Sequence, residues 1–423
     1  MNFHSRVVSL VAGLGLALWI GACSNSHLEP AQMQGAAAMV DDGELPRLWV
    51  LTKQEEVRQV GIGGGSRQIT AWRSDTFFHF DLQAFDPVAA KPVWKKRLLT
   101  RGDRDAQGAA PSRVIGSSEG ARLLGQDDQV VWLLIGDKPL AVSAADGRVM
   151  ADSQALQQAN PHLQGLLPSE ARRYGFDKGL VLMAADARMF VIRGPAFKAL
   201  AYTPPPTASE PQGRLNANGT REIVPMRPPV GEVPTRQAQV RGRWLGLYAE
   251  KEAADAAADE WGRKLRYPYT IVDEGAVTRR RFWHAKIVSV RRFDDRFERL
   301  DGITPVAGSP VFLKGRFMND SRTGKPRVPD SGEGVFVWHS TRIDDAGRLA
   351  LSRLDGDLKP VWHTELPLSE SSPVNLISTW SLPGFVAVTG LLQSKEAGVT
   401  SRVPQLVSID LNTGEAKSTT LTR

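Results

Sequence analysis

The sequence predicts an all-β protein assembled from repeated antiparallel sheets, and two observations lead to this fold class. Short segments of alternating or continuous apolar residues recur along the chain and end in Asp followed by turn residues, a pattern typical of hairpins. The chain contains 39 Gly and 27 Pro while 42% of its residues are hydrophobic. This composition indicates a globular chain with many turns rather than a disordered one.

The repeat is clearest in two copies, residues 82–94 and 351–362. Each has a strand that ends in Asp, then a turn, then a second strand that opens with Lys-Pro-Val-Trp. Weaker copies surround Asp146 and Asp410. We expect their Asp-Gly and Asn-Thr-Gly sequences to supply the positive φ angles of tight turns.

Trp94 and Trp362 hold the same place in the two clear copies. A large ring at the start of an outer strand can cover the junction with the next sheet or stack on a ligand. We expect core packing between sheets.

The spacing of the repeats predicts the number of sheets. Asp86 and Asp146 are 60 residues apart, and Asp355 and Asp410 are 55 apart. Residues 47–423 therefore accommodate about six to eight such units, and radial repetition is the usual way for them to avoid exposed edges. We expect a β-propeller of about six to eight four-stranded antiparallel blades.

The middle of the chain interrupts the strand pattern between residues 203 and 266. A proline-rich stretch from Tyr202 to Arg243 has no face to bury, so it is predicted to be a long exposed loop. Strong helix formers then follow from Tyr248 to Leu265, with acids leading to bases. We expect a small helical insert carried on the propeller.

The N-terminus has the features of a bacterial export signal. A short basic segment precedes the apolar residues 7–20, which are too few for a spanning helix, and the small pair Gly21-Ala22 precedes Cys23. This pattern resembles the lipobox of type II signal peptides. An ordinary secretory signal cut after Ala22 is the alternative, but a solitary exported thiol cannot form an internal disulfide, which favours lipidation.

The lipobox interpretation makes residues 1–22 a signal peptide and Cys23 an acylated, palmitate-bearing N-terminus. Residues 23–46 are small, polar and alanine-rich, and they are predicted to be a flexible tether. Ser24 stands where retained inner-membrane lipoproteins usually carry Asp. We therefore expect the protein at the outer membrane, anchored by lipid and facing the periplasm.

Catalytic motifs are weak. Residues 61–66 form a Gly-rich run without the lysine or the last glycine of a phosphate loop, so a flexible turn is the preferred interpretation. No H-E-x-x-H motif occurs. His79 and Asp81 are the short-range candidate pair for a ligand or metal, with surface hydrogen bonding as the simpler role. We predict no enzyme activity, no cofactor and no resident metal.

Two basic-aromatic segments form a possible anionic-ligand patch. Its residues are Arg279, Arg280, Arg281, Arg291 and Arg292. Arginine binds phosphate and carboxylate oxygens bidentately, so lipopolysaccharide, peptidoglycan or an acidic partner would fit. Alternating arginines on a strand can equally be a solvated face. The net charge of +7 is too small and too dispersed to indicate nucleic-acid binding.

The repeated form LxAxDxxxGxxxW resembles the repeats of quinoprotein-like (PQQ-like) β-propellers, and about four segments carry it. With a lipoprotein signal in front, the chain is similar to proteobacterial propeller lipoproteins and, more distantly, to the propeller lipoprotein of the outer-membrane β-barrel assembly machine. The enzymatic branch of this family binds pyrroloquinoline quinone with calcium and carries a disulfide between neighbouring cysteines. Because Cys23 is the one cysteine, that disulfide is impossible here.

This resemblance implies a lipid-anchored envelope scaffold or binding protein. Such a protein would contact the membrane through its acyl chains and an envelope protein through its propeller loops. The alternative is a small-ligand or redox-cofactor protein that uses the central channel.

Overall fold

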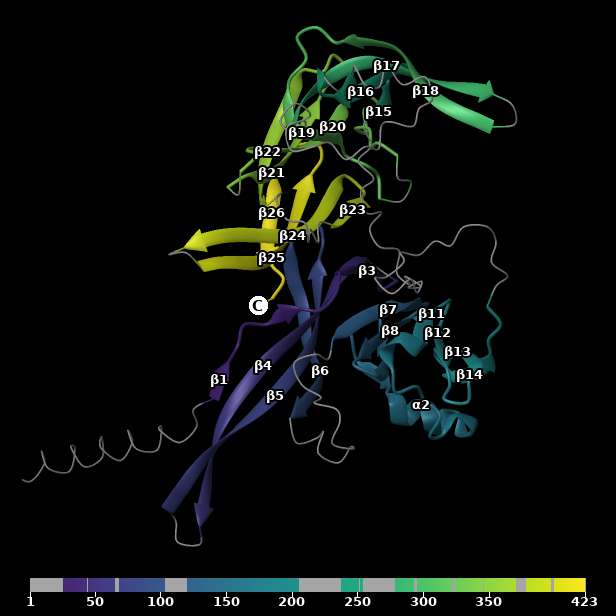
Figure 1. Cartoon of the computed structure of the whole chain (residues 1–423), viewed down its shortest axis with the longest axis vertical. Helices are drawn as coiled ribbons and strands as arrows, with labels where there is room; N and C mark the ends of the chain where they lie inside the picture. The colour runs from purple at the N-terminus through teal and green to yellow at the C-terminus, as the bar shows by residue number, and fades with distance from the viewer. Residues whose placement is uncertain are drawn as a thin grey trace, which may run out of the picture.

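The all-β prediction is confirmed by the computed structural model, which describes residues 26–43, 45–64, 68–102, 120–204, 237–250, 252–253, 278–292, 295–321, 323, 325–344, 346–369, 378–396 and 399–422. These residues lie mostly in antiparallel strands, arranged in successive four-stranded units (Figure 1). The predicted signal peptide, residues 1–22, and the predicted acylation site Cys23 lie outside the described residues.

The first sheet is built on two long strands with a third beside them: β4 (Pro46–Gly64), β5 (Gln68–Asp86) and β6 (Lys91–Gly102). Three short strands follow one another along the other edge of β4: β1 (Ser26–Leu28), β2 (Gln32–Met33) and β3 (Ala38–Asp41). The flexible tether predicted for residues 23–46 is therefore wrong for residues 26–41. A strand edge as long as that of β4 offers unpaired N–H and C=O groups, and short segments without a sequence period can satisfy them.

The second and third sheets follow in order along the chain. The second contains β7 (Ala121–Asp127), β8 (Val130–Ile135), β9 (Lys138–Ser143) and β10 (Val149–Ala151). The third contains β11 (Tyr174–Phe176), β12 (Leu180–Met183), β13 (Met189–Arg193) and β14 (Lys198–Ala201). Between them lie helix α2 (Ser153–Ala159) and the 3₁₀ turns η1 (Pro161–Leu163) and η2 (Ala171–Arg173). Helix α2 is capped by Asp152, whose carboxylate accepts a hydrogen bond from the Ala155 N–H.

The fourth and fifth units share one continuous sheet. The fourth contains β15 (Gln237–Val240), β16 (Arg243–Tyr248), β17 (Arg279–Arg292) and β18 (Asp295–Pro305). The fifth contains β19 (Phe312–Phe317), β20 (Val335–Ser340), β21 (Arg348–Leu354) and β22 (Pro360–Ser369). They join where the first two residues of β17 pair with β19. The sixth unit contains β23 (Ser378–Leu382), β24 (Phe385–Glu396), β25 (Val399–Asp410) and β26 (Ala416–Thr420).

The interruption expected at residues 203–266 is shorter than predicted. Residues 205–236 lie outside the described part, but β15 and β16 already form a hairpin from Gln237 onward. Most of the helix expected over residues 248–265 also lies outside it. Its beginning is described, because residues 250, 252 and 253 are helical and the Ala253 N–H donates to the Ala249 carbonyl at 2.9 Å.

Neighbouring sheets bury their apolar faces against each other. Trp49, Phe80 and Leu82 of the first sheet pack on Val131 and Leu133 of the second. Other clusters join the second sheet to the third, the fourth unit to the fifth, and the fifth to the sixth. The sixth sheet returns to the first. In that cluster Leu406 and Leu421 pack with residues that include Leu48 and Val50.

The predicted Asp turns are confirmed. Asp86 accepts hydrogen bonds from the N–H groups of residues 88 and 89 at 2.8 and 2.9 Å. Asp355 accepts from residues 357 and 359, both at 2.9 Å, and Asp410 accepts from residues 412 and 413 at 2.7 and 3.1 Å. The carboxylate therefore closes each turn by satisfying backbone donors that the ladder leaves unpaired.

The repeated tryptophans pack between sheets, as the sequence predicts. Trp94 meets Trp49 edge to face at 5.2 Å and lies over Gly147, the glycine of the β9–β10 turn in the next sheet. Trp362 lies in the same way over Gly414 of the β25–β26 turn. Both glycines have positive φ, 68° and 79°. Each of these positions needs glycine for two reasons: its φ is positive, and the tryptophan ring above it leaves no room for a side chain.

Three hairpins continue past their sheets as two-stranded arms (Figure 1). The β4–β5 arm comprises residues 59–64 and 68–74, beyond the pairing with β1 and β6. The β17–β18 arm comprises residues 286–292 and 295–301, beyond the pairing with β16. The β24–β25 arm comprises residues 391–396 and 399–404, beyond the pairing with β23 and β26.

Candidate functional site

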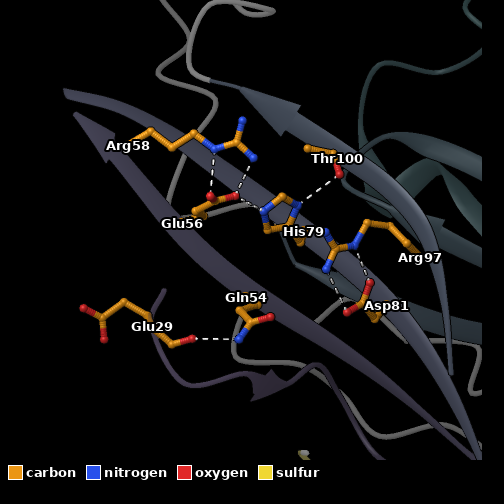
Figure 2. Close-up of polar contacts among 8 residues, drawn as sticks. All are labelled: Glu29, Gln54, Glu56, Arg58, His79, Asp81, Arg97 and Thr100. Atoms are coloured by element: carbon orange, nitrogen blue, oxygen red, sulfur yellow. Dashed lines mark hydrogen bonds and ion pairs between the residues drawn. The ribbon is translucent and has the colours of Figure 1, made fainter. Parts of the chain in front are cut away.

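The candidate pair His79 and Asp81 lies on a polar face of the first sheet. Strand alternation places Phe78, Phe80 and Leu82 on the opposite face, where they pack on the second sheet. Both candidates are buried, with 4% and 2% of their surface exposed. The predicted surface role is therefore wrong. His79 contacts polar side chains from both β4 and β6, and Asp81 contacts a polar side chain from β6 (Figure 2).

His79 connects a carboxylate to a hydroxyl. Its Nε2 lies 2.8 Å from Oε2 of Glu56 on β4, and its Nδ1 lies 3.0 Å from Oγ1 of Thr100 on β6 (Figure 2). An ionised carboxylate only accepts, so Nε2 donates to Glu56. In the neutral imidazole, Nδ1 then accepts from the Thr100 hydroxyl. The hydrogen bonds thus connect Glu56 through His79 to the exposed Thr100.

Glu56 stays ionised because Arg58 binds it. Nε and Nη2 of Arg58 donate to the two carboxylate oxygens at 2.7 and 2.8 Å. These bonds from Arg58 lower the pKa of Glu56 to about 2, with a further contribution from His79 and against the effect of burial. Arg58 also lies over the ring of Phe77 at 4.6 Å. Arg58 therefore holds the negatively charged carboxylate of Glu56 in place beside His79.

Asp81 belongs to a separate ion pair. Arg97 on β6 donates to it from Nε at 2.8 Å and from Nη2 at 3.3 Å (Figure 2), and Nζ of Lys95 lies 3.6 Å away. The two candidates share a face but bind different partners. Among the described residues, no group of three or more His, Cys, Asp or Glu side chains could hold a metal ion.

The N-terminal segment borders this polar face. Nε2 of Gln54 donates to the Glu29 carbonyl at 3.0 Å (Figure 2), and the Glu29 N–H donates to the Glu55 carbonyl at 2.8 Å. The segment after β1 is therefore fastened to β4 beside Glu56.

The arginine patch does not form a single site. Arg279, Arg280 and Arg281 lie at the start of β17, whereas Arg291 and Arg292 lie at its end, in register with Arg296 and Asp295. About ten residues of strand separate the two groups by roughly 33 Å. The side chains of Arg291 and Arg292 lie outside the described part, and anion binding by either group remains a prediction.

Two arginines at the start of β17 already have acidic partners. Arg280 binds Glu252 through Nε and Nη2, both at 3.0 Å, and donates to the Gly315 carbonyl at 2.9 Å. The Glu252 side chain is fully buried. Arg281 pairs with the exposed Glu250 at 3.0 Å and lies over Trp283, while Arg279 is exposed. Arg280 therefore serves the fold through a buried ion pair.

The fifth unit contains a cluster of two histidines and a serine that was not predicted from the sequence. Oγ of Ser352 lies 3.0 Å from Nε2 of His339 and 3.1 Å from Nδ1 of His363, and the two imidazoles stack at 5.2 Å. Burial lowers the pKa of His339 to about 4. Both histidines follow a tryptophan in the sequence. That shared position was a usable signal, but only the strand register brings Ser352 between them.

Comparison with known proteins adds no family. No protein-family model matches the chain, and no curated protein matches it significantly. Within the residues that the structure describes, no helix is long and apolar enough to cross a membrane.

Proposed function

We propose that the protein is a lipid-anchored β-propeller that acts as an envelope scaffold, binding partners through its projecting arms. The stacking of the sheets supports a propeller. Among the described residues, apolar clusters join the first sheet to the second, the second to the third, the fourth to the fifth, the fifth to the sixth and the sixth to the first, and no cluster joins the third to the fourth. Neighbouring blades of a propeller pack in this order, and a closed ring would need one more junction, between the third and fourth units.

The three arms are the main observation that supports a binding role. An isolated two-stranded ribbon is marginally stable in water, because its two faces have little to bury. Arms of this kind gain stability when a partner covers one face or adds a strand to an edge. A stack of sheets holding three such arms is suited to binding rather than to catalysis.

The composition of the β17–β18 arm fits a protein partner. Residues 285–301 contain Asp294, Asp295, Glu298 and Asp301 together with five basic residues. Charges of both signs at close spacing give specificity and orientation in protein contacts, because each must meet its opposite. Acylation of Cys23 would hold the scaffold at the membrane, since two or three acyl chains give stable anchoring.

In-cell photo-crosslinking tests this function. A photo-reactive amino acid replaces Arg402 on the β24–β25 arm or His284 at the base of the β17–β18 arm, both exposed, with the exposed Ala145 as the control position. We expect arm positions to give a discrete crosslinked protein and Ala145 to give none. Mass spectrometry of the same samples should show diacylglycerol and acyl mass at Cys23. Crosslinks to lipid alone from both arms would contradict the scaffold role.

A further inference from the structure

The chain downstream of the acylation site runs along β4 in the opposite direction. Ser26 lies opposite Arg58, Gln32 opposite Lys53, and Ala38 opposite Trp49. Because β4 runs outward toward the arm, the start of β1 is the point of this segment nearest to the arm. Ser26, the first described residue, therefore lies at the base of the β4–β5 arm.

The distance from this point to the acylated residue is short. Cys23 precedes Ser26 by three residues, which span at most about 11 Å when extended. Beyond Arg58, β4 continues for six residues to Gly64, which adds about 20 Å of arm. If Cys23 is acylated, the bilayer surface lies within about 11 Å of the base of the arm. The rest of the first sheet extends from this base in the direction opposite to the arm (Figure 1). The arm then lies along the bilayer surface or enters it.

The sequence of this arm suits a lipid surface. Residues 59–74 contain two arginines and no acid, together with the apolar residues Val60, Ile62, Ile69 and Trp72. Arginine binds lipid phosphates, and tryptophan prefers the interface between headgroups and acyl chains. The other arms differ, since the β17–β18 arm carries four acids and the β24–β25 arm carries Glu396 beside Lys395.

We propose that the β4–β5 arm is a membrane-contacting element that lies in the headgroup region of the bilayer into which Cys23 is acylated. This rests on the proposed lipid anchor. The two contacts then fix the orientation of the protein: the anchor and the arm bind the membrane side by side, and the opposite end of the first sheet, where Asp86 closes the β5–β6 turn, points away from it.

An environment-sensitive dye on the arm tests the proposal. Ala71, opposite Ile62 in the arm, is replaced by Cys and labelled with NBD in the acylated protein, where the lipid occupies the natural thiol. The matched control is Ala145→Cys, an exposed alanine in the β9–β10 turn, which contacts the Asp86 end of the first sheet through Trp94. Both proteins are reconstituted into phosphatidylcholine vesicles with and without phosphatidylglycerol.

We expect NBD at position 71 to shift to the blue and brighten several-fold in both vesicle types, more strongly with phosphatidylglycerol, and NBD at position 145 to stay as in water. Arg73→Gln should remove part of the phosphatidylglycerol effect. A protein that mass spectrometry shows acylated, but whose position 71 responds no more than position 145, would overturn the arm contact and leave the anchor intact. An unmodified Cys23 would overturn both.

Discussion

Gly147→Ala measures how strongly one sheet is held to the next. A Cβ at Gly147 would lie 2.4 Å from the ring of Trp94, and the residue has φ of 68°. Gly384 is a matched control, because its φ is 69° and a Cβ there would meet nothing within 4 Å. Both substitutions place an alanine at a positive φ and so have the same backbone cost in unfolding free energy. Only the alanine at position 147 would also meet a tryptophan ring.

The structure sets the size of each effect. A left-handed conformation costs an L-residue about 1–2 kcal/mol, which is the whole expected loss of unfolding free energy for Gly384→Ala. Crowding a packed side chain costs about 1–3 kcal/mol more. Gly147→Ala should therefore lower the unfolding free energy by about 2–5 kcal/mol.

Urea denaturation followed by far-ultraviolet circular dichroism provides the measurement for both variants. In a Trp94→Ala background the additional loss at Gly147 should disappear, because no ring remains for the Cβ to meet. Equal losses for the two glycine variants in the natural background would refute the reasoning. The contact between Trp94 and the β9–β10 turn would then be too loose to join the sheets.

Three further predictions concern buried or turn-closing polar groups. His339 has its pKa lowered to about 4 from 6.5, so protonation favours the unfolded state. The free energy of unfolding should have its full His339 contribution above pH 6.5 and lose about 2–3 kcal/mol of it by pH 4.5, and this loss should be absent from His339→Gln when urea unfolding is compared at the two pH values. Equal pH sensitivity of wild type and variant would contradict this. Glu252→Gln should cost about 3–5 kcal/mol in thermal or urea unfolding because it leaves the Arg280 guanidinium without its buried partner, whereas Glu250→Gln, at an exposed ion pair, should cost under about 1 kcal/mol. Asp410→Ala should cost about 1–2 kcal/mol by removing the acceptor of two turn N–H groups, and Asp410→Asn, which keeps an acceptor oxygen, should recover most of that loss.

The turns could be predicted because their causes are local, and the inter-sheet tryptophans because they recur at the same place in two repeats. Asp410 accepts from donors two and three residues ahead, and Gly147 needs positive φ within its own turn. Such requirements can be recognised in the sequence as Asp and Gly at fixed positions of the turn. The all-β fold class followed from this pattern.

The N-terminal strands could not be predicted in the same way. Strands such as β2, two residues long, have no period to detect, and they exist because the edge of β4 offers partners. The candidate site has the same origin. The sequence places His79 and Asp81 on one face, but Glu56 and Thr100 reach His79 only through cross-strand register, which depends on the whole sheet.

The packing of the sixth sheet on the first has a consequence for biogenesis. Leu48 and Val50 near the start are covered by Leu406 and Leu421 near the end of the chain. Ribosomal synthesis delivers the N-terminal half of this contact several hundred residues before the C-terminal half. The apolar side chains of Leu48 and Val50 therefore stay uncovered until Leu406 and Leu421 have been synthesised, which favours chaperone binding. A premature stop before Leu406 would leave this apolar surface exposed even though most of the chain is present.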